Sequence, residues 1–579
     1  MASTLPKLPV FEAVARHDPD STAVIHSNSG RQFRYGELLG DVCKVRQRLY
    51  ETAGRDNLDG ERVAFLVENS YDYVVTLLAI LAAKSIAVPM SPAFPAPELQ
   101  YILNHSEALM LLSSSKLAPK AQDVLKTKLD VEPAYLQLDK FQGGSTHDKI
   151  SLDETGPGAA GMMLYTSGTT NRPKGVLLPQ SVMTAQARSL LQAWEYSPTD
   201  HLLHVLPLHH IHGTINAIFT PLFSGSTIEF MFPFNADAVW RRFAAPFFSS
   251  DQQPPAPTHY QKKITFFTAV PTIYSRLLTT HKTLPPDMQH ATRTAISPSN
   301  LRLAISGSAA LPTPIKRAWA ELSGGNVLLE RFGMTEVGMA ISCGLDVADR
   351  VDGSVGWPLP GVEARLVDVD TQQVIERGHE RDADGRERVG EIQLRGPSVF
   401  AKYWRNPEAT AKEFVDDGAK DGRGKWFKTG DVAVRRAVEG AGKSEVPSQR
   451  EWTRGDMYFI LGRRSADIIK SGGEKVSALE VEREMLALPQ VAEVAVVAVP
   501  SGKWGQKVGA VVILDKENVP GGRWSPLEMR RALKGQLAGY KIPQVLKVVD
   551  HIPRNAMGKI NKKTLVKEVF RDEFSGDEL

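Results

Sequence analysis

Cysteine is almost absent from this chain of 579 residues, which contains only Cys43 and Cys343. Two cysteines so far apart rule out a disulfide scaffold, and their scarcity fits a reducing compartment. A strong excess of one charge is also missing. The formal net charge is +3, which argues against a dedicated nucleic-acid-binding protein, because such a protein carries a clustered basic face. We therefore expect no nucleic-acid partner.

Long hydrophobic runs and targeting signals are missing as well. The most apolar run, residues 74–90, is interrupted by Lys84 and is too short to span a bilayer, so we interpret it as a buried helix that leads into a strand. The first twenty residues lack the pattern of a secretory signal and the composition of a transit peptide. We expect a soluble protein without stable membrane insertion, in the cytoplasm or the mitochondrial matrix.

Strand-length apolar runs alternate with helix-length amphipathic segments along the chain. RVAFLVEN is followed by SYDYVVTLLAILAAK, and KITFFTAV is followed by PTIYSRLLTTH. This alternation predicts an α/β fold with parallel sheets and crossover helices. Polar segments rich in glycine, proline or charge, such as residues 435–456, are expected to be surface insertions.

A new pattern of elements begins after residue 462. A helix, two strands, a second helix and a last strand follow one another. Together they span about a hundred residues, which is a normal size for a self-sufficient α+β domain. We therefore predict an N-terminal domain over residues 1–462 and a C-terminal domain over residues 463–579.

The strongest local signal is LYTSGTTNRPKGV, residues 164–176. A strand leads into a run of hydroxyl residues and glycine whose backbone N–H groups are free to hold phosphate oxygens, and Lys174 adds positive charge. The spacing is not that of a Walker A loop, because Pro173 stands where that motif requires glycine. The segment predicts a phosphate-binding loop of another kind; a polar surface loop is the alternative.

YTSGTTNRPKGV closely resembles the phosphate-binding signature of the adenylate-forming superfamily, which includes acyl-CoA synthetases, peptide-synthetase adenylation domains and beetle luciferases. Four more motifs follow in the family's order: RFGMTE at 331–336, FKTGD at 427–431, GRRSADIIKSGGEKVSALEVE at 462–482 and PRNAMGK at 553–559. The resemblance covers essentially the whole chain. It implies a large N-terminal domain of parallel sheets flanked by helices, with a β-barrel-like subdomain, and a small mobile α+β C-terminal domain.

The resemblance also implies a reaction in two halves. A carboxylate attacks the α-phosphorus of ATP and releases pyrophosphate, and the thiol of CoA then attacks the acyl-adenylate and releases AMP. Because the carboxylate and the triphosphate are both anionic, catalysis needs cations and hydrogen-bond donors that neutralise charge and align the attack. The implied cofactors are ATP, Mg²⁺ and CoA. The expected partners are small-molecule substrates, and the expected assembly is a monomer or a homodimer.

Several residues of these motifs match positions that bind the nucleotide in the family. Those implied to bind the β- and γ-phosphates are Thr166, Ser167, Gly168, Thr169, Thr170 and Lys174. Thr335 is implied to bind the α-phosphate, and Phe332 to stack on adenine. Glu336, together with Thr166, is implied to hold Mg²⁺, a hard cation that prefers oxygen ligands.

The ribose, the pocket walls and the thiol have their own implied residues. Asp431 is implied to accept hydrogen bonds from both ribose hydroxyls, with Arg463 nearby. The implied walls of the base or acyl pocket are Ser308, Ala309, Gly333 and Met334. Gly472 and Gly473 are implied to let pantetheine approach the backbone closely.

The C-terminal domain is implied to rotate between the half-reactions. Lys559 matches the lysine that reaches the carboxylate and the α-phosphate in the first half-reaction. A hinge is expected over residues 463–467, because a few residues at the ends of elements absorb such motions. GRRSAD is one residue longer than the common pattern, so the sequence does not decide which residue is the pivot of the hinge. We choose Ser465.

LPLHHIHGT, residues 206–214, contains three histidines in four positions. On the expected strand, His210 and His212 share a face, while His209 points away and is assigned a structural role. In the family this strand walls the acyl pocket. We place His210 near the reacting carboxylate, as a catalytic candidate beside Thr335, Glu336 and Lys559. A zinc hydrolase site is the disfavoured alternative, because no carboxylate follows His212 closely.

The substrate is predicted from two departures from the family pattern. His212 stands where an aromatic residue is usual, and Arg331 stands where glycine is common. A buried cation without a partner is costly, so a second carboxylate on the substrate, paired with Arg331, is the economical explanation. A structural salt bridge between Arg331 and Glu330 or a helix end is the alternative. Arg302 is a weaker candidate.

HHIHG, ERFGMTEVGM and ISGSAALP are most similar to malonyl-CoA synthetases, including the eukaryotic acyl-CoA synthetase family member 3 group. This resemblance implies malonate as the substrate and methylmalonate as a second one. Two alternatives stay open. One is a synthetase for another short-chain, medium-chain or aromatic acid, and the other is a stand-alone adenylation enzyme that loads a carrier protein.

Overall fold

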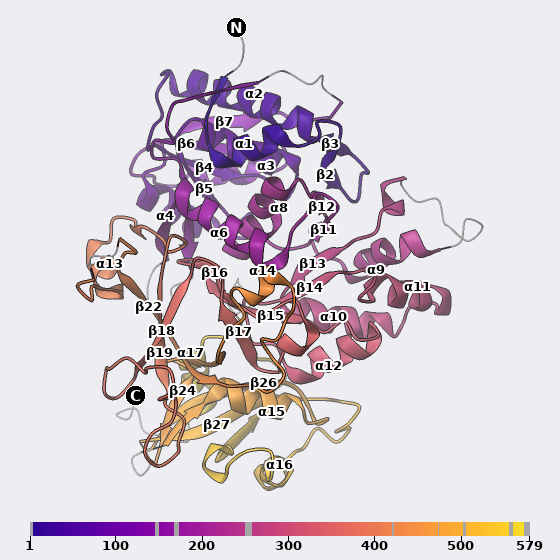
Figure 1. Cartoon of the computed structure of the whole chain (residues 1–579), viewed down its shortest axis with the longest axis vertical. Helices are drawn as coiled ribbons and strands as arrows, with labels where there is room; N and C mark the ends of the chain where they lie inside the picture. The colour runs from indigo at the N-terminus through magenta and orange to yellow at the C-terminus, as the bar shows by residue number, and fades with distance from the viewer. Residues whose placement is uncertain are drawn as a thin grey trace.

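The computed structural model of the chain describes residues 4–144, 150–166, 173–248, 258–419, 422–472, 474–501, 505–554 and 560–571. Two large sheets form the N-terminal part, and a smaller sheet lies at the opposite end of the molecule (Figure 1). None of the helices in this described part is both long and apolar enough to cross a membrane.

The first sheet has seven strands and carries the predicted phosphate loop between two of them. In spatial order the strands are β20 (Lys402–Tyr403), β10 (Lys174–Pro179), β9 (Gly161–Thr166), β5 (Ile86–Pro89), β4 (Arg62–Leu66), β6 (Met110–Ser114) and β7 (Ala134–Leu138). Strands β5, β4, β6, β7 and β9 run parallel. Helix α3 (Tyr71–Ala82) is buried along its whole length, because it lies between layers, which explains its continuous apolar sequence.

The second sheet changes from parallel to antiparallel pairing at β15. Its parallel half consists of β2 (Thr22–His26), β12 (Thr227–Phe230), β11 (His201–His204), β13 (Phe266–Ala269), β14 (Leu303–Ser306) and β15 (Leu329–Met334). Its antiparallel half, the expected barrel-like subdomain, consists of β16 (Gly338–Ser342), β17 (Ser354–Pro358), β23 (Met457–Arg463), β22 (Trp426–Arg436), β19 (Gly390–Arg395) and β18 (Glu363–Asp368). The parallel strands end at one edge, where α/β sheets bind ligands.

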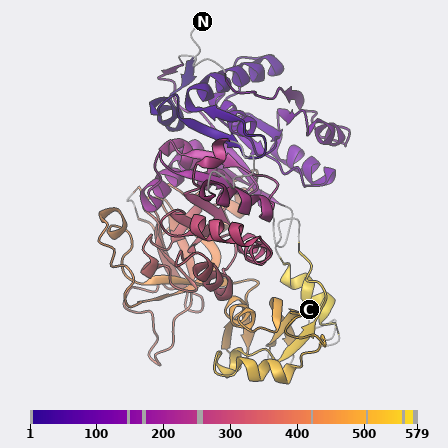
Figure 2. The same cartoon turned by 90° about the vertical axis from the view of Figure 1, so that its right-hand side faces the viewer.

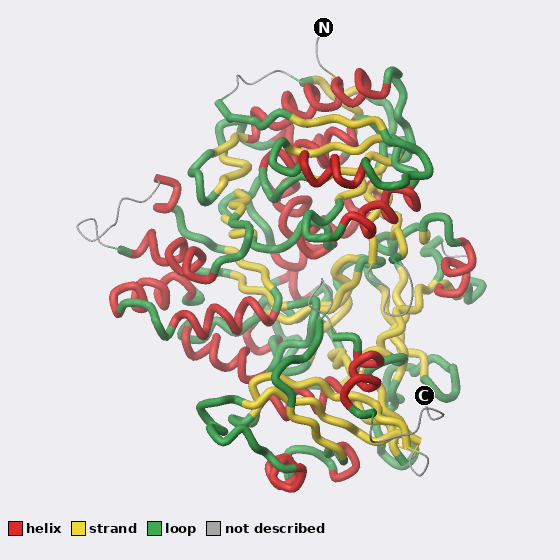
Figure 3. The backbone as a smooth tube through the Cα atoms, turned by 180° about the vertical axis from the view of Figure 1, so that it is seen from behind, coloured by secondary structure: helices red, strands yellow, loops and turns green. Residues whose placement is uncertain are grey.

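Helices pack beside the parallel half of this sheet, on the left in the view from behind (Figure 3). Helices α9 (Ala236–Ala244), α10 (Pro271–His281) and α12 (Thr313–Leu322) pack through one apolar cluster against one face of the parallel half. The predicted strand-then-helix pairs are thereby confirmed as β4 with α3 and β13 with α10.

The C-terminal unit has its own sheet and its own cores. Its strands are β24 (Ile468–Ser471), β25 (Glu474–Ser477), β26 (Val491–Ser501), β27 (Gly505–Leu514) and β28 (Val545–Val548), and its helices are α15 (Ala478–Leu486), α16 (Pro526–Leu533) and α17 (Lys562–Val569). Two apolar clusters contain only residues beyond 468. A turned view shows the unit at the end of the molecule opposite the N-terminus (Figure 2). These elements match the predicted α+β domain; the boundary at residue 462 stays a prediction.

The prediction that LPLHHIHGT forms a strand is wrong. Strand β11 ends at His204, and a short helix, α7 (Ile211–Thr214), begins after a turn. The turn is held because the Thr214 hydroxyl donates to the Leu208 carbonyl at 2.8 Å. It is also tight, since a Cβ on Gly213 would lie 2.4 Å from the Pro207 carbonyl oxygen. The histidines are therefore distributed over a turn and a helix rather than alternating on a strand.

The expectation that residues 435–456 form a surface insertion is also wrong in part. Helix α14 (Pro447–Arg450) lies within this segment, and Gln449 is buried. The Gln449 amide donates to the Ala193 carbonyl at 2.9 Å. Buried polar side chains are hydrogen-bonded in this way, and polarity alone did not distinguish such a residue from an exposed one.

Candidate active site

Strand β15 and the turn after it join two groups of predicted site residues. Arg331 lies in β15, and Glu336 lies in the turn between β15 and β16. Both side chains are buried. One group surrounds Arg331, and the other surrounds Glu336. The predicted RFGMTE motif therefore connects a cationic position with an acidic one over six residues of the chain.

Arg331 is a buried cation without an ionic partner among the described residues. Its Nη2 donates to Ser308 Oγ at 3.4 Å, while its Nε is buried and has no hydrogen-bond partner. Its guanidinium packs on Gly307, where a Cβ would lie 2.4 Å from Arg331 Cζ. Burial lowers the pKa of Arg331 to about 9, so the group still carries its charge at neutral pH.

His212 completes the Arg331 cluster, which we define as His212, Thr268, Ser308 and Arg331. Its Nε2 lies 2.6 Å from Thr268 Oγ1, and its Nδ1 lies 3.2 Å from Ser308 Oγ. Burial, with Arg331 nearby, lowers the pKa of His212 well below 6.5. His212 is therefore neutral at neutral pH and adds no second positive charge. It orients the Ser308 hydroxyl, which also accepts from Arg331.

Backbone strain accompanies this cluster. Ser308 has a φ of +67° although it is not glycine. Such a conformation costs of order 1–3 kcal/mol and persists at functional sites, where the surrounding contacts fix it. Here the contacts of Ser308 Oγ with His212 and Arg331 fix the side chain.

The alternative salt bridge between Arg331 and Glu330 is wrong. Neighbouring residues of a strand point to opposite faces, and Glu330 Oε1 instead lies 2.8 Å from Lys316 Nζ. Arg302 is likewise occupied, because its Nε and Nη2 lie 3.0 and 2.8 Å from the two carboxylate oxygens of Asp200. Arg302 is therefore a structural residue, whereas no carboxylate of the described residues contacts Arg331.

The other two histidines lie beside the cluster. His209 packs edge-on against Phe94, with ring centroids 5.4 Å apart, and its ring lies 4.1 Å from that of His210. His210 caps helix α7, where its carbonyl accepts from the Thr214 N–H at 3.1 Å. Within the described ranges no group of three or more His, Cys, Asp or Glu side chains could hold a metal ion.

Glu336 belongs to the second group, whose central residue is Tyr403. The Tyr403 hydroxyl donates to Glu336 Oε1 at 2.9 Å. Lys174 Nζ lies 4.2 Å from the centroid of the Tyr403 ring, a cation–π contact. Burial, and next the negative charge of Glu336, raise the pKa of Tyr403 far above its usual value, so its hydroxyl stays protonated and donates.

Asp431 and Arg463 face each other across neighbouring strands. They are register partners in β22 and β23, and Arg463 Nε lies 3.2 Å from Asp431 Oδ1. Asp431 chiefly, and Glu336 to a smaller degree, raise the pKa of Arg463 against the opposing effect of burial. The structure therefore brings the predicted ribose residues together and sets Arg463 in the field of Glu336.

The remaining predicted residues are placed as follows. Thr166 ends β9, opposite Lys174 at the start of β10, so the two flank the predicted phosphate loop. Phe332, Gly333 and Met334 continue β15, and Thr335 opens the turn after it. Ala309 follows Ser308, and Gly472 lies in the turn between β24 and β25. Residues 167–170, Gly473 and Lys559 lie outside the described residues.

Two residues of the site were not predicted from the sequence. Thr268 stands near the end of the parallel strand β13, and the rule that ligands bind at the carboxyl ends of such strands could have indicated it. Tyr403 lies in GPSVFAKYW, where no local pattern separates it from an ordinary core tyrosine. Both supply hydroxyl groups that hold predicted residues in place.

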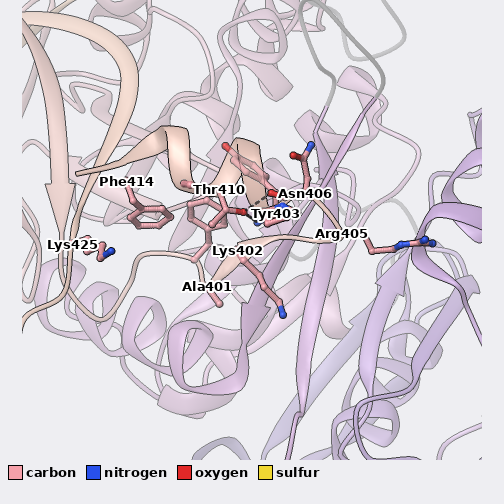
Figure 4. Close-up of a pocket in the computed structure, with 11 residues that line it drawn as sticks. Ala401, Lys402, Tyr403, Arg405, Asn406, Thr410, Phe414 and Lys425 are labelled. Atoms are coloured by element: carbon pink, nitrogen blue, oxygen red, sulfur yellow. Dashed lines mark hydrogen bonds between the residues drawn. The ribbon is translucent and has the colours of Figure 1, made fainter. Parts of the chain in front are cut away.

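Tyr403 also borders a surface hollow of about 560 Å³ (Figure 4). Its lining includes the apolar residues Phe400 and Phe414 and the cationic residues Lys402 and Arg405. None of the predicted site residues that the structure describes lines this hollow. The hollow therefore adjoins the candidate site at Tyr403.

The chain matches known families over both parts. Residues 11–404 match the model of AMP-binding enzymes, and residues 480–559 match that of the AMP-binding enzyme C-terminal domain. A CoA ligase of Gibberella moniliformis is 57% identical over 97% of this chain and 94% of its own length. The mitochondrial malonate–CoA ligase ACSF3 of Mus musculus is 39% identical over 93% of this chain and 87% of its own length.

A solved structure agrees over the whole chain. ATP-bound MatB from Rhodopseudomonas palustris has a TM-score of 0.77 and 30% identity, and the match covers 99% of this chain and 100% of that chain. The chain belongs to the AMP-binding enzyme family, with the α/β architecture of adenylate-forming enzymes. It is an AMP-forming acid–CoA ligase, which confirms the class predicted from its motifs.

Proposed function

We propose that this enzyme is a malonate–CoA ligase, which converts ATP, malonate and CoA into malonyl-CoA, AMP and pyrophosphate. Methylmalonate is the proposed second substrate. The observation that carries the proposal is Arg331, a buried guanidinium without a carboxylate among the described residues. A substrate that is a monocarboxylate would leave this charge unpaired once its only carboxylate faced the α-phosphorus.

A short diacid suits the Arg331 cluster better than a long-chain or aromatic acid. A guanidinium can bind a carboxylate through two parallel hydrogen bonds, and Arg331 has a free Nε besides the Nη2 that contacts Ser308. The neutral His212 and the hydroxyls of Thr268 and Ser308 are polar neighbours that an alkyl chain would desolvate. The names of similar proteins that act on malonate support the same choice.

The nucleotide half of the site fits the first half-reaction. Lys174 supplies positive charge at the phosphate loop, and Asp431 is proposed to hold the ribose. One oxygen of Glu336 accepts from Tyr403, and the other has no hydrogen-bond partner among the described residues, so Glu336 fits a Mg²⁺ ligand. Bound Mg²⁺ would neutralise charge on the triphosphate, with phosphate oxygens completing its shell.

The test is a comparison of acids in the purified enzyme. Pyrophosphate release is measured with malonate, methylmalonate, octanoate and cinnamate, each with and without CoA, and thioester formation is measured separately. Malonate is expected to give the highest kcat/KM. Equal or better turnover of octanoate or cinnamate would contradict the proposal, and transfer to a carrier protein but not to CoA would favour the carrier-loading alternative.

Arg331→Met tests the residue that carries the proposal. The KM for malonate is expected to rise about 100-fold, because a hydrogen-bonded charge pair contributes up to about 3 kcal/mol. The KM for ATP is expected to stay within twofold. Arg48→Met, which breaks a partly exposed pair with Asp139 remote from the site, serves as the control and should change neither constant. An unchanged malonate KM in Arg331→Met would refute the role of Arg331.

A further inference from the structure

A chain of polar contacts runs from the proposed ribose residue into the small domain. Asp431 Oδ1 lies 3.2 Å from Arg463 Nε. The backbone N–H of Arg463 donates to Asp467 Oδ2 at 3.0 Å. The other oxygen, Asp467 Oδ1, lies 2.6 Å from Lys562 Nζ. Lys562 Nζ also lies 2.7 Å from Glu482 Oε1.

These residues belong to both parts of the molecule. Arg463 ends β23, a strand of the second sheet in the N-terminal part. Asp467 precedes β24, a strand of the C-terminal sheet. Glu482 lies in α15, and Lys562 begins α17. The carboxylate of Asp467 thus connects strand β23 with Lys562, a residue that was not predicted from the sequence.

Lys562 is the cation on which both carboxylates depend. Its side chain is 12% exposed, against 13% for Asp467 and 16% for Glu482, so water screens the three charges weakly. Burial opposes its charge, but Glu482 and Asp467 together raise the pKa of Lys562. Removal of this ammonium would leave two carboxylates close together without a cation in contact with both.

We propose that Lys562 is a positioning residue for nucleotide binding. Lys562 fixes the carboxylate of Asp467, and this carboxylate holds the backbone of Arg463 where the Arg463 side chain faces Asp431. Without Lys562, repulsion between Asp467 and Glu482 turns the Asp467 carboxylate away and releases the Arg463 N–H. The inference rests on the proposed role of Asp431 in binding the ribose.

The experiment measures nucleotide binding directly, by calorimetric titration of the full-length enzyme with ATP and Mg²⁺ in the absence of any acid. Lys562→Met is expected to raise the Kd for ATP about tenfold. Its KM values for the acid and for CoA are expected to change less than twofold. A merely structural role would lower the thermal midpoint and leave the Kd of the folded protein unchanged.

A matched control is available in the same domain. Lys541 Nζ lies 2.7 Å from Glu480 Oε1, and its side chain is 21% exposed, but neither residue contacts the network. Lys541→Met is therefore expected to leave the Kd for ATP within twofold of the wild-type value. Lys562→Arg, which keeps the positive charge, is expected to restore most of the affinity that Lys562→Met loses.

Two more variants keep the inference falsifiable. If Lys562→Met does not fold, Asp467→Asn replaces it as the test. Asp467→Asn keeps a side-chain oxygen but weakens the contact with Lys562, and it is expected to raise the Kd for ATP severalfold. Asp431→Ala tests the underlying site: an unchanged Kd there would overturn the ribose assignment and this inference together. A large rise in Asp431→Ala with no rise in folded Lys562→Met or Asp467→Asn would overturn the positioning role alone.

Discussion

Two buried arginines at the parallel half of the second sheet, Arg242 in helix α9 and Arg331 in strand β15, have opposite surroundings. Arg242 contacts Glu229 with its Nε at 2.8 and 3.0 Å from the two carboxylate oxygens. His201 Nε2 lies 2.8 Å from the same carboxylate, and the Ser27 hydroxyl donates to it at 2.7 Å. We call these four residues the Glu229 cluster. The Arg331 cluster, near β15 of the same sheet, has no carboxylate among the described residues.

The difference lies between a cation that is paired within the fold and one that has no carboxylate among the described residues. Taking an ion out of water costs several kcal/mol, so a buried cation is normally paired within the fold. Arg242 follows this rule, and its partner comes from β12. Arg331 departs from it, since the described residues offer its guanidinium no carboxylate. This contrast supports the proposal that Arg331 binds a carboxylate of the substrate.

Arg242→Met provides the largest expected effect. This change leaves the fully buried Glu229 without its main cation, and breaking a buried pair costs about 3–5 kcal/mol. The free energy of unfolding, measured by urea denaturation, is expected to fall by that amount. A loss below about 1 kcal/mol would show that the Glu229 cluster behaves like a surface pair and would break the comparison.

The acid dependence of stability provides the second effect. Although burial raises it, Arg242 and His201 lower the pKa of Glu229 from its usual 4.5 to about 2. Because the folded-state value is the lower one, this stabilisation is complete above pH 4.5 and is lost as the pH falls toward 2. It amounts to about 3 kcal/mol. The difference in unfolding free energy between wild type and Glu229→Gln, measured from pH 6 down to pH 2, should shrink across that window; a constant difference would contradict the assigned pKa.

The same comparison shows what the sequence could predict. The motifs RFGMTE and FKTGD contain the predicted residues Arg331, Glu336 and Asp431, which lie in β15, in the turn after it and in β22. Their roles in the reaction stay predictions. Strand and helix periodicity predicted the parallel sheets with their flanking helices and the elements of the C-terminal unit. These signals are local, and short stretches of chain carry them.

Features that depend on particular contacts rather than on hydrophobic periodicity were not predicted. The helix at His212 forms because Gly213 meets Pro207 and Thr214 bonds Leu208, while strand alternation described the segment equally well. The partners Thr268 and Tyr403 come from other strands. Whether an arginine has an ionic partner is also a property of the fold, because no local pattern around Arg242 indicates that Glu229 is its partner.

Arg331→Met tests the other side of the comparison with the same substitution as at Arg242. Replacing a desolvated, unpaired cation by an apolar side chain of similar length removes a cost, so the free energy of unfolding is expected to stay unchanged or to rise by about 1–2 kcal/mol. Urea denaturation in the absence of substrate measures it. A loss similar to that of Arg242→Met would mean that Arg331 has a structural partner after all.

Gly307→Ala provides the smallest effect and tests the geometry around Arg331. The new methyl group would lie 2.4 Å from Arg331 Cζ and 2.5 Å from its Nε, so the flexible guanidinium must move while the backbone stays. The KM for malonate is expected to rise about tenfold, or about 1.4 kcal/mol, with little change in the thermal midpoint. Gly521→Ala, at a glycine whose Cβ would meet nothing within 4 Å, is the control and should leave both unchanged. A lower thermal midpoint with an unchanged malonate KM would contradict this expectation. The position of the guanidinium would then matter to the stability of the fold rather than to binding of the acid, and Arg331 would be a structural residue like Arg242.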